Sequence, residues 1–193
     1  MRILTLDLAT TTGFAFGEAG AVPESGSVIL SKKGDDAHQP SRALGTWLRK
    51  RFFTFKDSYP TLIVAEDLMS PDAQPHQSVI ISQILLHGSL NCLAANYGVE
   101  VRRVAASTVR KHFCGKAFAL PRGKGPRTPK ERAEARAATK AMVLRQCHLL
   151  NYFPRSVDDD NRADAVAVFD YSSAHYARMP VTQAFALSAG GGQ

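Results

Sequence analysis

Residues 2–17 read RILTLDLATTTGFAFG, and this stretch decides the architecture that we expect of the chain. Its first part, RILTLDL, is a short apolar run that contains Asp7 near its end. The segment from Gly13 to Gly17 alternates in polarity between two glycines, as the strands of a hairpin do. A third strand is expected at residues 25–31, so three strands in succession predict an antiparallel meander that opens a mixed sheet.

Helices and further strands alternate after the meander. Apolar residues recur at helical spacing from Pro40 to Phe55 and again from Pro75 to Tyr97. Between these helices, Thr61–Glu66 is an apolar run that ends at a carboxylate, as a buried central strand would. We therefore expect an α/β fold in which antiparallel strands are followed by parallel ones. The remaining expected elements are a strand at 99–104 and helices at 107–113, 129–149 and from 158–160 to about 176.

A length of 193 residues suits one α/β domain with a full hydrophobic core. We expect this domain to span residues 1–179, with residues 180–193 as a flexible tail. No apolar run approaches the ~20 residues that cross a bilayer. The N-terminal residues lack the apolar core and cleavage site of a signal peptide. We therefore expect a cytoplasmic protein that has no membrane partner.

Three acidic residues stand inside or at the end of apolar elements. Asp7 follows ILTL, Glu66 follows LIVA, and Asp164 lies in the Ala-rich stretch RADAVAV. Burying a carboxylate is costly unless something pairs with it, so three such acids suggest one shared cation. Carboxylates without His or Cys select hard ions such as Mg²⁺ or Mn²⁺. Two such ions can activate a water and stabilise the leaving oxygen of a phosphodiester.

A fourth ligand is expected from the run DDDN at residues 158–161. Asp160 lies four residues before Asp164, so the two share one face of a helix. Each acid also has a structural interpretation: Asp7 can simply end a strand, and at least one of the consecutive aspartates is expected to cap the helix. The joint pattern, rather than any single acid, favours a metal site.

The net charge of +7 is concentrated in one block, from Val101 to Arg145, where only Glu131 and Glu134 are acidic. Such a block is typical of a surface that binds phosphate groups. Any one of its residues can equally be solvated surface charge. Its basic members are Arg102, Arg103, Arg110, Lys111, Lys116, Arg122, Lys124, Arg127, Lys130, Arg132, Arg136, Lys140 and Arg145.

Taken in order, these motifs resemble the RuvC family of Holliday-junction resolvases, over the chain up to about Tyr176. LDLATTTGFAF resembles the family's first strand and hairpin, and VAEDLM resembles its second catalytic strand. SQILLHGSLNCLAANYGVEV is similar to the helix that has a glycine in mid-course. VAASTVRKHFCGKA followed by TKAMV resembles the basic segment, and DDDNRADAVAVFDY resembles the final catalytic helix.

The resemblance implies an RNase H-like sheet flanked by α-helices. It also implies a homodimer that uses Mg²⁺ or Mn²⁺ to cut a four-way DNA junction symmetrically. It assigns catalysis and metal binding to Asp7, Glu66 and Asp164, with Asp160 or Asn161 as the fourth ligand. Lys111 and Lys116 fall in the family's DNA-facing segment, and Lys140 matches a lysine near the following helix. The residues expected to bind DNA are Arg110, Lys111, Lys116, Arg122, Lys124, Arg127, Lys130 and Lys140.

The sequence departs from the family pattern in three places. Asn161 stands where the family has an acid, three residues before the last catalytic aspartate. Met69 lies near the position of an aromatic residue that follows the catalytic glutamate, and the loop 117–129 is longer than usual. These differences resemble phage or prophage members with a broader range of branched DNA substrates.

Two other functions fit parts of the pattern. LDLATTTGFA also resembles the phosphate-binding hairpin of sugar kinases and actin-like ATPases. Those proteins need a second lobe and a Gly-rich adenosine motif, for which the chain is too short. Asn161 also leaves open a protein that binds branched nucleic acid without cutting it, because such a protein would have lost one metal ligand.

Overall fold

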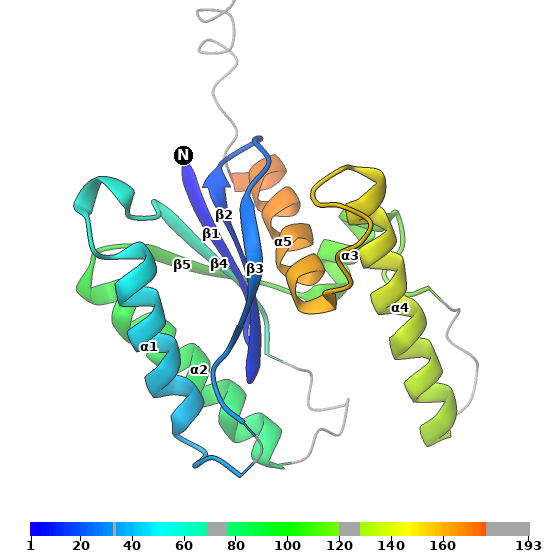
Figure 1. Cartoon of the computed structure of the whole chain (residues 1–193), viewed down its shortest axis with the longest axis horizontal. Helices are drawn as coiled ribbons and strands as arrows, with labels where there is room; N and C mark the ends of the chain where they lie inside the picture. Colours follow the sequence, from blue (N-terminus) through cyan, green and yellow to red (C-terminus); the bar gives the residue numbers. More distant parts are fainter. Residues whose placement is uncertain (33, 69–76, 120–127, 177–193) are drawn as a thin grey trace, which may run out of the picture.

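The computed structural model describes residues 1–32, 34–68, 77–119 and 128–176. Within them, five strands form one sheet in the order β3-β2-β1-β4-β5 (Figure 1). β1, β2 and β3 are antiparallel, whereas β4 pairs in parallel with β1 and β5 pairs in parallel with β4. The mixed sheet expected from the sequence is therefore confirmed. Its strands are β1 Arg2–Asp7, β2 Thr11–Glu18, β3 Glu24–Ile29, β4 Leu62–Glu66 and β5 Glu100–Val104.

Helices cover both faces of the sheet (Figure 1). α1 (Gln39–Phe52) and α2 (Gln77–Asn96) enclose one core, and a short 3₁₀ helix, η1 (Lys56–Ser58), follows α1. α3 (Ala106–Cys114), α4 (Pro129–Leu149) and α5 (Asp160–Tyr176) enclose the other core. The central strand β1 serves both, because alternate side chains of a strand point to opposite faces. Leu4 and Leu6 are buried with α1 and α2, whereas Ile3 is buried with α5.

α5 is held against β1 by a buried hydroxyl. Thr5 is fully buried, and its Oγ1 donates a hydrogen bond to the carbonyl oxygen of Ala165 on α5, at 2.7 Å. Two residues further along the same strand, Asp7 shares the face of Thr5. The contact therefore brings the second turn of α5, which carries Asp164, to the end of β1 where Asp7 stands.

β2 approaches the first turn of α5 so closely that it needs a glycine. A Cβ built on Gly13 would lie 1.9 Å from the backbone oxygen of Asn161. Gly13 is also the β2 residue that pairs with Asp7 in the hairpin. The close approach therefore occurs beside the acid at the end of β1, and any side chain at residue 13 would push α5 away from it.

α4 begins with a complete set of helix-start signals. The Oγ1 of Thr128 accepts a hydrogen bond from the backbone N–H of Glu131, and the Glu131 carboxylate accepts one from the backbone N–H of Thr128. Pro129 follows at the first turn, where its missing N–H costs nothing. Only the later half of α4 packs in the core, through Thr139, Val143 and Cys147, and the earlier half projects from the body (Figure 1).

One expectation about a helix was wrong. α1 ends at Phe52 rather than Phe55, and Phe55 is 73% exposed. The hydroxyl of Thr54 donates to the carbonyl of Lys50 at 2.8 Å, which satisfies an acceptor that continuing the helix would have used. In addition, α2 has 20 residues and a mean hydropathy of 1.4, so it is long and apolar enough to cross a membrane by length and composition alone. A mostly buried core helix can pass the same test, but only 22% of this window is buried, with Leu86, Leu90 and Ala94 among the buried residues of α2.

Replacing Gly13 with alanine tests the close approach of β2 and α5. We expect Gly13→Ala to lower the free energy of unfolding by at least about 1–3 kcal/mol, as overpacked buried sites do. Gly88→Ala is the matched control, because Gly88 lies in a helix and an added Cβ meets nothing within 4 Å. Alanine there should be neutral or stabilise by up to about 1 kcal/mol. Equal stabilities of the two variants in urea denaturation would contradict the constraint.

Candidate active site

The three predicted acids meet at one edge of the sheet. Asp7 ends β1 and Glu66 ends β4, and these two strands are parallel neighbours, so their carboxyl ends coincide. Asp164 arrives from the second turn of α5, which packs on β1. Asp164 is 7% exposed, and the side chain of Glu66 is 20% exposed. The fold therefore gathers three carboxylates from distant parts of the chain into one largely buried place.

Burial raises the pKa of all three acids, and the charges of neighbouring acids add to it. The pKa of Asp7 rises from 3.8 to about 7, mainly because burial removes water and then because Asp164 is close. The pKa of Glu66 rises from 4.5 to about 8, through burial and then the charges of Asp7 and Asp164. Burial also raises the pKa of Asp164. Each acid is thus within electrostatic reach of the others, and the cluster resists being fully ionised on its own.

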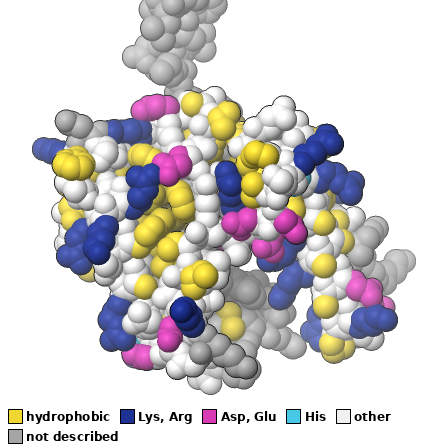
Figure 2. All heavy atoms as spheres, in the orientation of Figure 1, with side chains coloured by type: hydrophobic (Ala, Val, Ile, Leu, Met, Phe, Trp, Pro, Cys, Tyr) yellow, Lys and Arg dark blue, Asp and Glu magenta, His cyan; other side chains and the backbone are white. Residues whose placement is uncertain are grey.

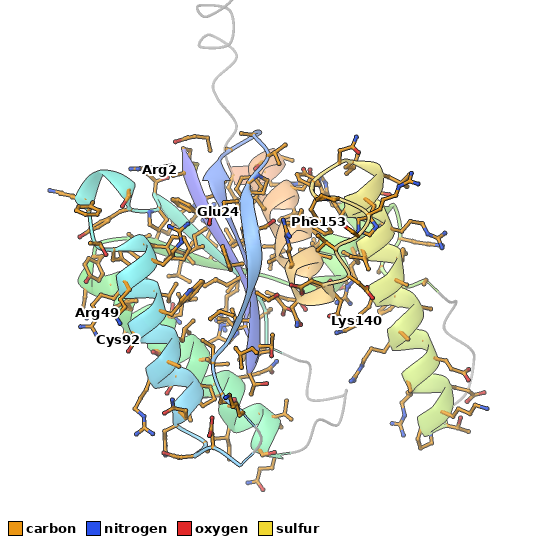
Figure 3. All side chains as sticks on the ribbon, in the orientation of Figure 1. Arg2, Glu24, Arg49, Cys92, Lys140 and Phe153 are labelled. Carbon is orange, nitrogen blue, oxygen red and sulfur yellow. The ribbon has the colours of Figure 1, made fainter. Side chains whose placement is uncertain are left out.

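Two basic residues stand among the acids. Arg110 of α3 places its Nη2 3.9 Å from Oε1 of Glu66 and 4.0 Å from Oδ1 of Asp164. Lys140 of α4 pairs with Asp160 and extends toward α5 (Figure 3). Both cations lower the pKa of Asp7, Glu66 and Asp164, but burial outweighs them. The guanidinium of Arg110 is only 20% exposed, so it is part of the site.

The aspartates before α5 have different roles. Oδ1 of Asp159 accepts hydrogen bonds from the backbone N–H of Arg162, at 3.0 Å, and from Oγ of Ser27, at 2.9 Å. Asp159 is therefore the capping acid. The charge of Asp160 raises the pKa of Asp7 and of Asp164, which places Asp160 within reach of the cluster. Asn161 follows on the same turn, with its backbone carbonyl against Gly13.

The donor chemistry of the site suits a hard divalent cation. It consists of carboxylate oxygens only, which Mg²⁺ and Mn²⁺ prefer. A cation among them would offset both the burial and the repulsion that raise their pKa. Within the described ranges, however, no three His, Cys, Asp or Glu side chains already surround one point. An ion would have to draw Asp7, Glu66 and Asp164 inward and loosen the contacts of Arg110.

The predicted DNA-binding residues fall into three groups. Arg110 and Lys140 lie at the acids, as described above. Lys111, Lys116 and Lys130 are exposed. Figure 2 shows acidic side chains gathered near the middle of one face, with basic side chains beside them and along α4. Arg122, Lys124 and Arg127 lie outside the described residues, as do Met69 and the expected tail 180–193.

Comparison of structures identifies the fold. RuvC of Thermus thermophilus superposes with a TM-score of 0.62 at 14% identity, over 93% of this chain and 96% of that chain. T. thermophilus RuvC in complex with a Holliday junction substrate gives 0.61 at 13% identity, over the same shares. The chain has the RuvC fold. The yeast mitochondrial Holliday junction resolvase Ydc2 is less similar, with a TM-score of 0.48 at 14% identity, over 91% of this chain and 81% of that chain.

The resemblance to RuvC drawn from the sequence motifs is thus confirmed at the level of fold, and so is the RNase H-like sheet. No protein-family model matches the chain, and no curated protein matches it in sequence. The similarity to the RuvC fold spans nearly the whole chain. At this identity the likeness does not assign roles to residues, so the chemistry of the acids must do so.

Sequence reasoning missed Gly13 as a residue that shapes the site in this RuvC fold, and it gave Arg110 a DNA-binding role without placing it among the acids. Gly13 was expected only to bound a strand, and its proximity to Asn161 depends on how α5 packs. Its pairing with Asp7 across the hairpin was the signal that it lay near the acids. Arg110 was expected to face DNA from a basic segment, and the structure places it between Glu66 and Asp164. No spacing in the sequence relates α3 to those two acids.

The raised pKa values predict how stability depends on pH without metal. Because the pKa of Asp7 and Glu66 is higher in the folded protein, the folded state binds more protons between about pH 4 and pH 8. The free energy of unfolding should therefore fall as pH rises through this window. Asp7→Asn removes one of these ionisations, so it should flatten the decline and stabilise the protein at pH 8 by at least about 1 kcal/mol.

The measurement is urea denaturation in EDTA at several pH values. Asp158→Asn serves as the control, because Asp158 is an exposed acid in the same segment as Asp160. It should leave the decline unchanged. A wild-type stability that increases from pH 5 to pH 8 would contradict the picture of crowded, buried acids.

Proposed function

We propose that the chain is a divalent-metal-dependent endonuclease that cuts branched DNA, such as four-way junctions. The convergence of Asp7, Glu66 and Asp164 at one edge of the sheet carries this proposal. Burying carboxylates that raise one another's pKa costs folding free energy. A divalent ion bound among them would offset this cost. The substrate class is supported by the RuvC structure that was solved with a Holliday junction substrate.

Asp7, Glu66 and Asp164 would hold the Mg²⁺ or Mn²⁺, with Asp160 or Asn161 as a further ligand. When bound, such ions polarise the scissile phosphate and activate the attacking water. Arg110 and Lys140, positioned by α3 and α4, place positive charge where a phosphate would enter. They would hold the phosphate that the acids alone would repel. Acidic side chains would thus bind the metal ion, and the basic side chains beside them would bind the DNA phosphates.

One panel of substrates tests the activity. A four-way junction, a flap, a replication fork and plain duplex are incubated with the protein in Mg²⁺, in Mn²⁺ and in EDTA. We expect nicking of at least one branched substrate with metal and none in EDTA. Binding of branched DNA without cutting in either metal would support the non-catalytic alternative instead.

We also propose that two copies act together. The start of α2 exposes a group of large apolar side chains: Val79, Ile80, Ile81 and Ile84 are 38–54% exposed, and Leu68 nearby in sequence is 36% exposed. Several exposed large apolar side chains on one short stretch of helix favour an interface. A second copy of the chain, related by a two-fold axis, would cover this group with the same group. Two active sites would then be available for the two strands of a junction.

Substitution of the acidic residues should reduce DNA cutting without weakening DNA binding. We expect Asp7→Asn and Glu66→Gln to reduce nicking at least about 100-fold, because each removes a carboxylate from the ion. Binding to the junction in EDTA should be unchanged or tighter, since less negative charge faces the phosphates. Gel shift and nicking assays measure the two effects. Equal losses of binding and cutting would contradict the assignment of the acids to metal.

Substitutions at Asp160 and Asn161 can show which of the two residues is the fourth metal ligand. We expect Asp160→Asn to nearly abolish nicking and Asn161→Ala to be mild, because a carboxylate offers a hard ion a full charge. The structure also gives Asp160 an electrostatic effect on Asp7 and Asp164. Nicking rates against Mg²⁺ concentration measure this for both variants and for Asn161→Asp. A near-wild-type curve for Asp160→Asn, with higher activity of Asn161→Asp, would assign the ligand to Asn161.

The dimer proposal predicts the effect of charge on α2. We expect Ile81→Glu combined with Ile84→Glu to convert a dimer to a monomer, because buried carboxylates would face each other across the interface. Ile29→Glu is the control, since Ile29 is 67% exposed on β3, away from α2. Sedimentation equilibrium gives the mass of each variant. A monomeric wild-type protein at micromolar concentration would refute the dimer.

A further inference from the structure

The projecting half of α4 carries a row of basic residues that the sequence block alone did not distinguish. Arg132, Arg136 and Lys140 lie four residues apart, so they follow one face of the helix. Lys140, at the end of the row, pairs with Asp160 beside the acidic cluster. Arg132 and Arg136 are exposed and continue the row away from the site.

This row occupies the inner face of α4. Each residue turns a helix by about 100°, so Arg132 and Arg136 lie within roughly 40° of the direction of Val143. Val143 and Cys147 are the residues through which the later half of α4 packs in the core. The face that is apolar where α4 meets the protein thus becomes basic where α4 projects. Figure 2 shows basic side chains on the side of α4 that faces the rest of the molecule.

Helix stability does not account for the row. Like charges four residues apart destabilise a helix, and Arg132 and Arg136 form no ion pair with any residue that the structure describes. The side chain of Glu131 is engaged with Thr128 at the start of the helix, and Glu134 lies on roughly the opposite face from the row. The residues beside the row are small rather than acidic, namely Ala133, Ala135 and Ala137. A broad, rigid polyanion can therefore approach it closely.

We infer that Arg132 and Arg136 bind the phosphate backbone of one duplex arm of the DNA and guide its strand to Lys140 at the acidic site. This inference rests on the proposed nuclease function and specifies where the arm lies. Eight residues of helix span about 12 Å, which corresponds to roughly three or four phosphates of one strand along the duplex axis. Contacts of this kind position DNA without reading its sequence. The projecting half of α4 therefore positions one duplex arm of the DNA, whatever the base sequence of that arm.

Salt dependence of binding tests the row. The full chain is compared as wild type, as Arg132→Gln with Arg136→Gln, and as Arg145→Gln. Arg145 is the matched control, because it is exposed on the same helix but lies on the opposite face. Fluorescence anisotropy in EDTA gives the affinity for a labelled four-way junction at several salt concentrations. The double variant should lower the slope of log K against log salt by about two units, equally for junctions of different sequence.

The control should leave that slope unchanged, and thermal melting should show both variants folded. Equal slopes for wild type and double variant would overturn the inference, and so would an equal drop for Arg145→Gln. If the wild type cuts no branched DNA but the double variant still loses two units of slope, the nuclease proposal fails while the DNA-binding row stands. If cutting is normal and the slope is unchanged, the row fails while the nuclease proposal stands.

Discussion

The close packing of α5 against β1 and β2 is the constraint on which the site depends. Without a side chain at Gly13, the first turn of α5 sits directly on β2. The buried hydroxyl of Thr5 then ties the second turn to β1. Together these two contacts bring Asp164 across about 160 residues of chain to the edge where Asp7 and Glu66 end their strands. The packing of α5 on β1 and β2 therefore brings the acids together although they repel one another.

The acids in turn explain the cations around them. Burial is the main cause of the raised pKa of all three carboxylates, and repulsion from neighbouring acids adds to it. Arg110 and Lys140 relieve only part of it. A divalent ion would complete the neutralisation and leave both cations able to contact a phosphate. The same arrangement is consistent with the metal binding and the DNA binding that we propose, and the basic row leads away from Lys140 along α4.

The strands of the sheet and the acidic residues of the site could be predicted from the sequence, because both show in short local patterns of residues. An apolar run that ends in an acid identified Asp7 and Glu66, and the helical spacing of Asp160 and Asp164 placed both on one face. The parts that failed depend on contacts between distant elements. The place of Arg110 depends on how α3 packs against α5. The end of α1 is a local exception, where the hydroxyl of Thr54 bonds to the carbonyl of Lys50. The basic face of α4 became visible only once the structure showed which side of that helix packs in the core.

We propose that Asp7, Glu66 and Asp164 together hold a divalent ion. The most direct test of this proposal counts Mn²⁺ ions bound per chain at pH 8, by the electron paramagnetic resonance signal of free Mn²⁺. Wild type and the Asp158→Asn control should each bind at least one ion, and Asp164→Asn should bind fewer or bind them far more weakly. Wild-type protein that leaves all the Mn²⁺ free, with or without a four-way junction present, would contradict the account.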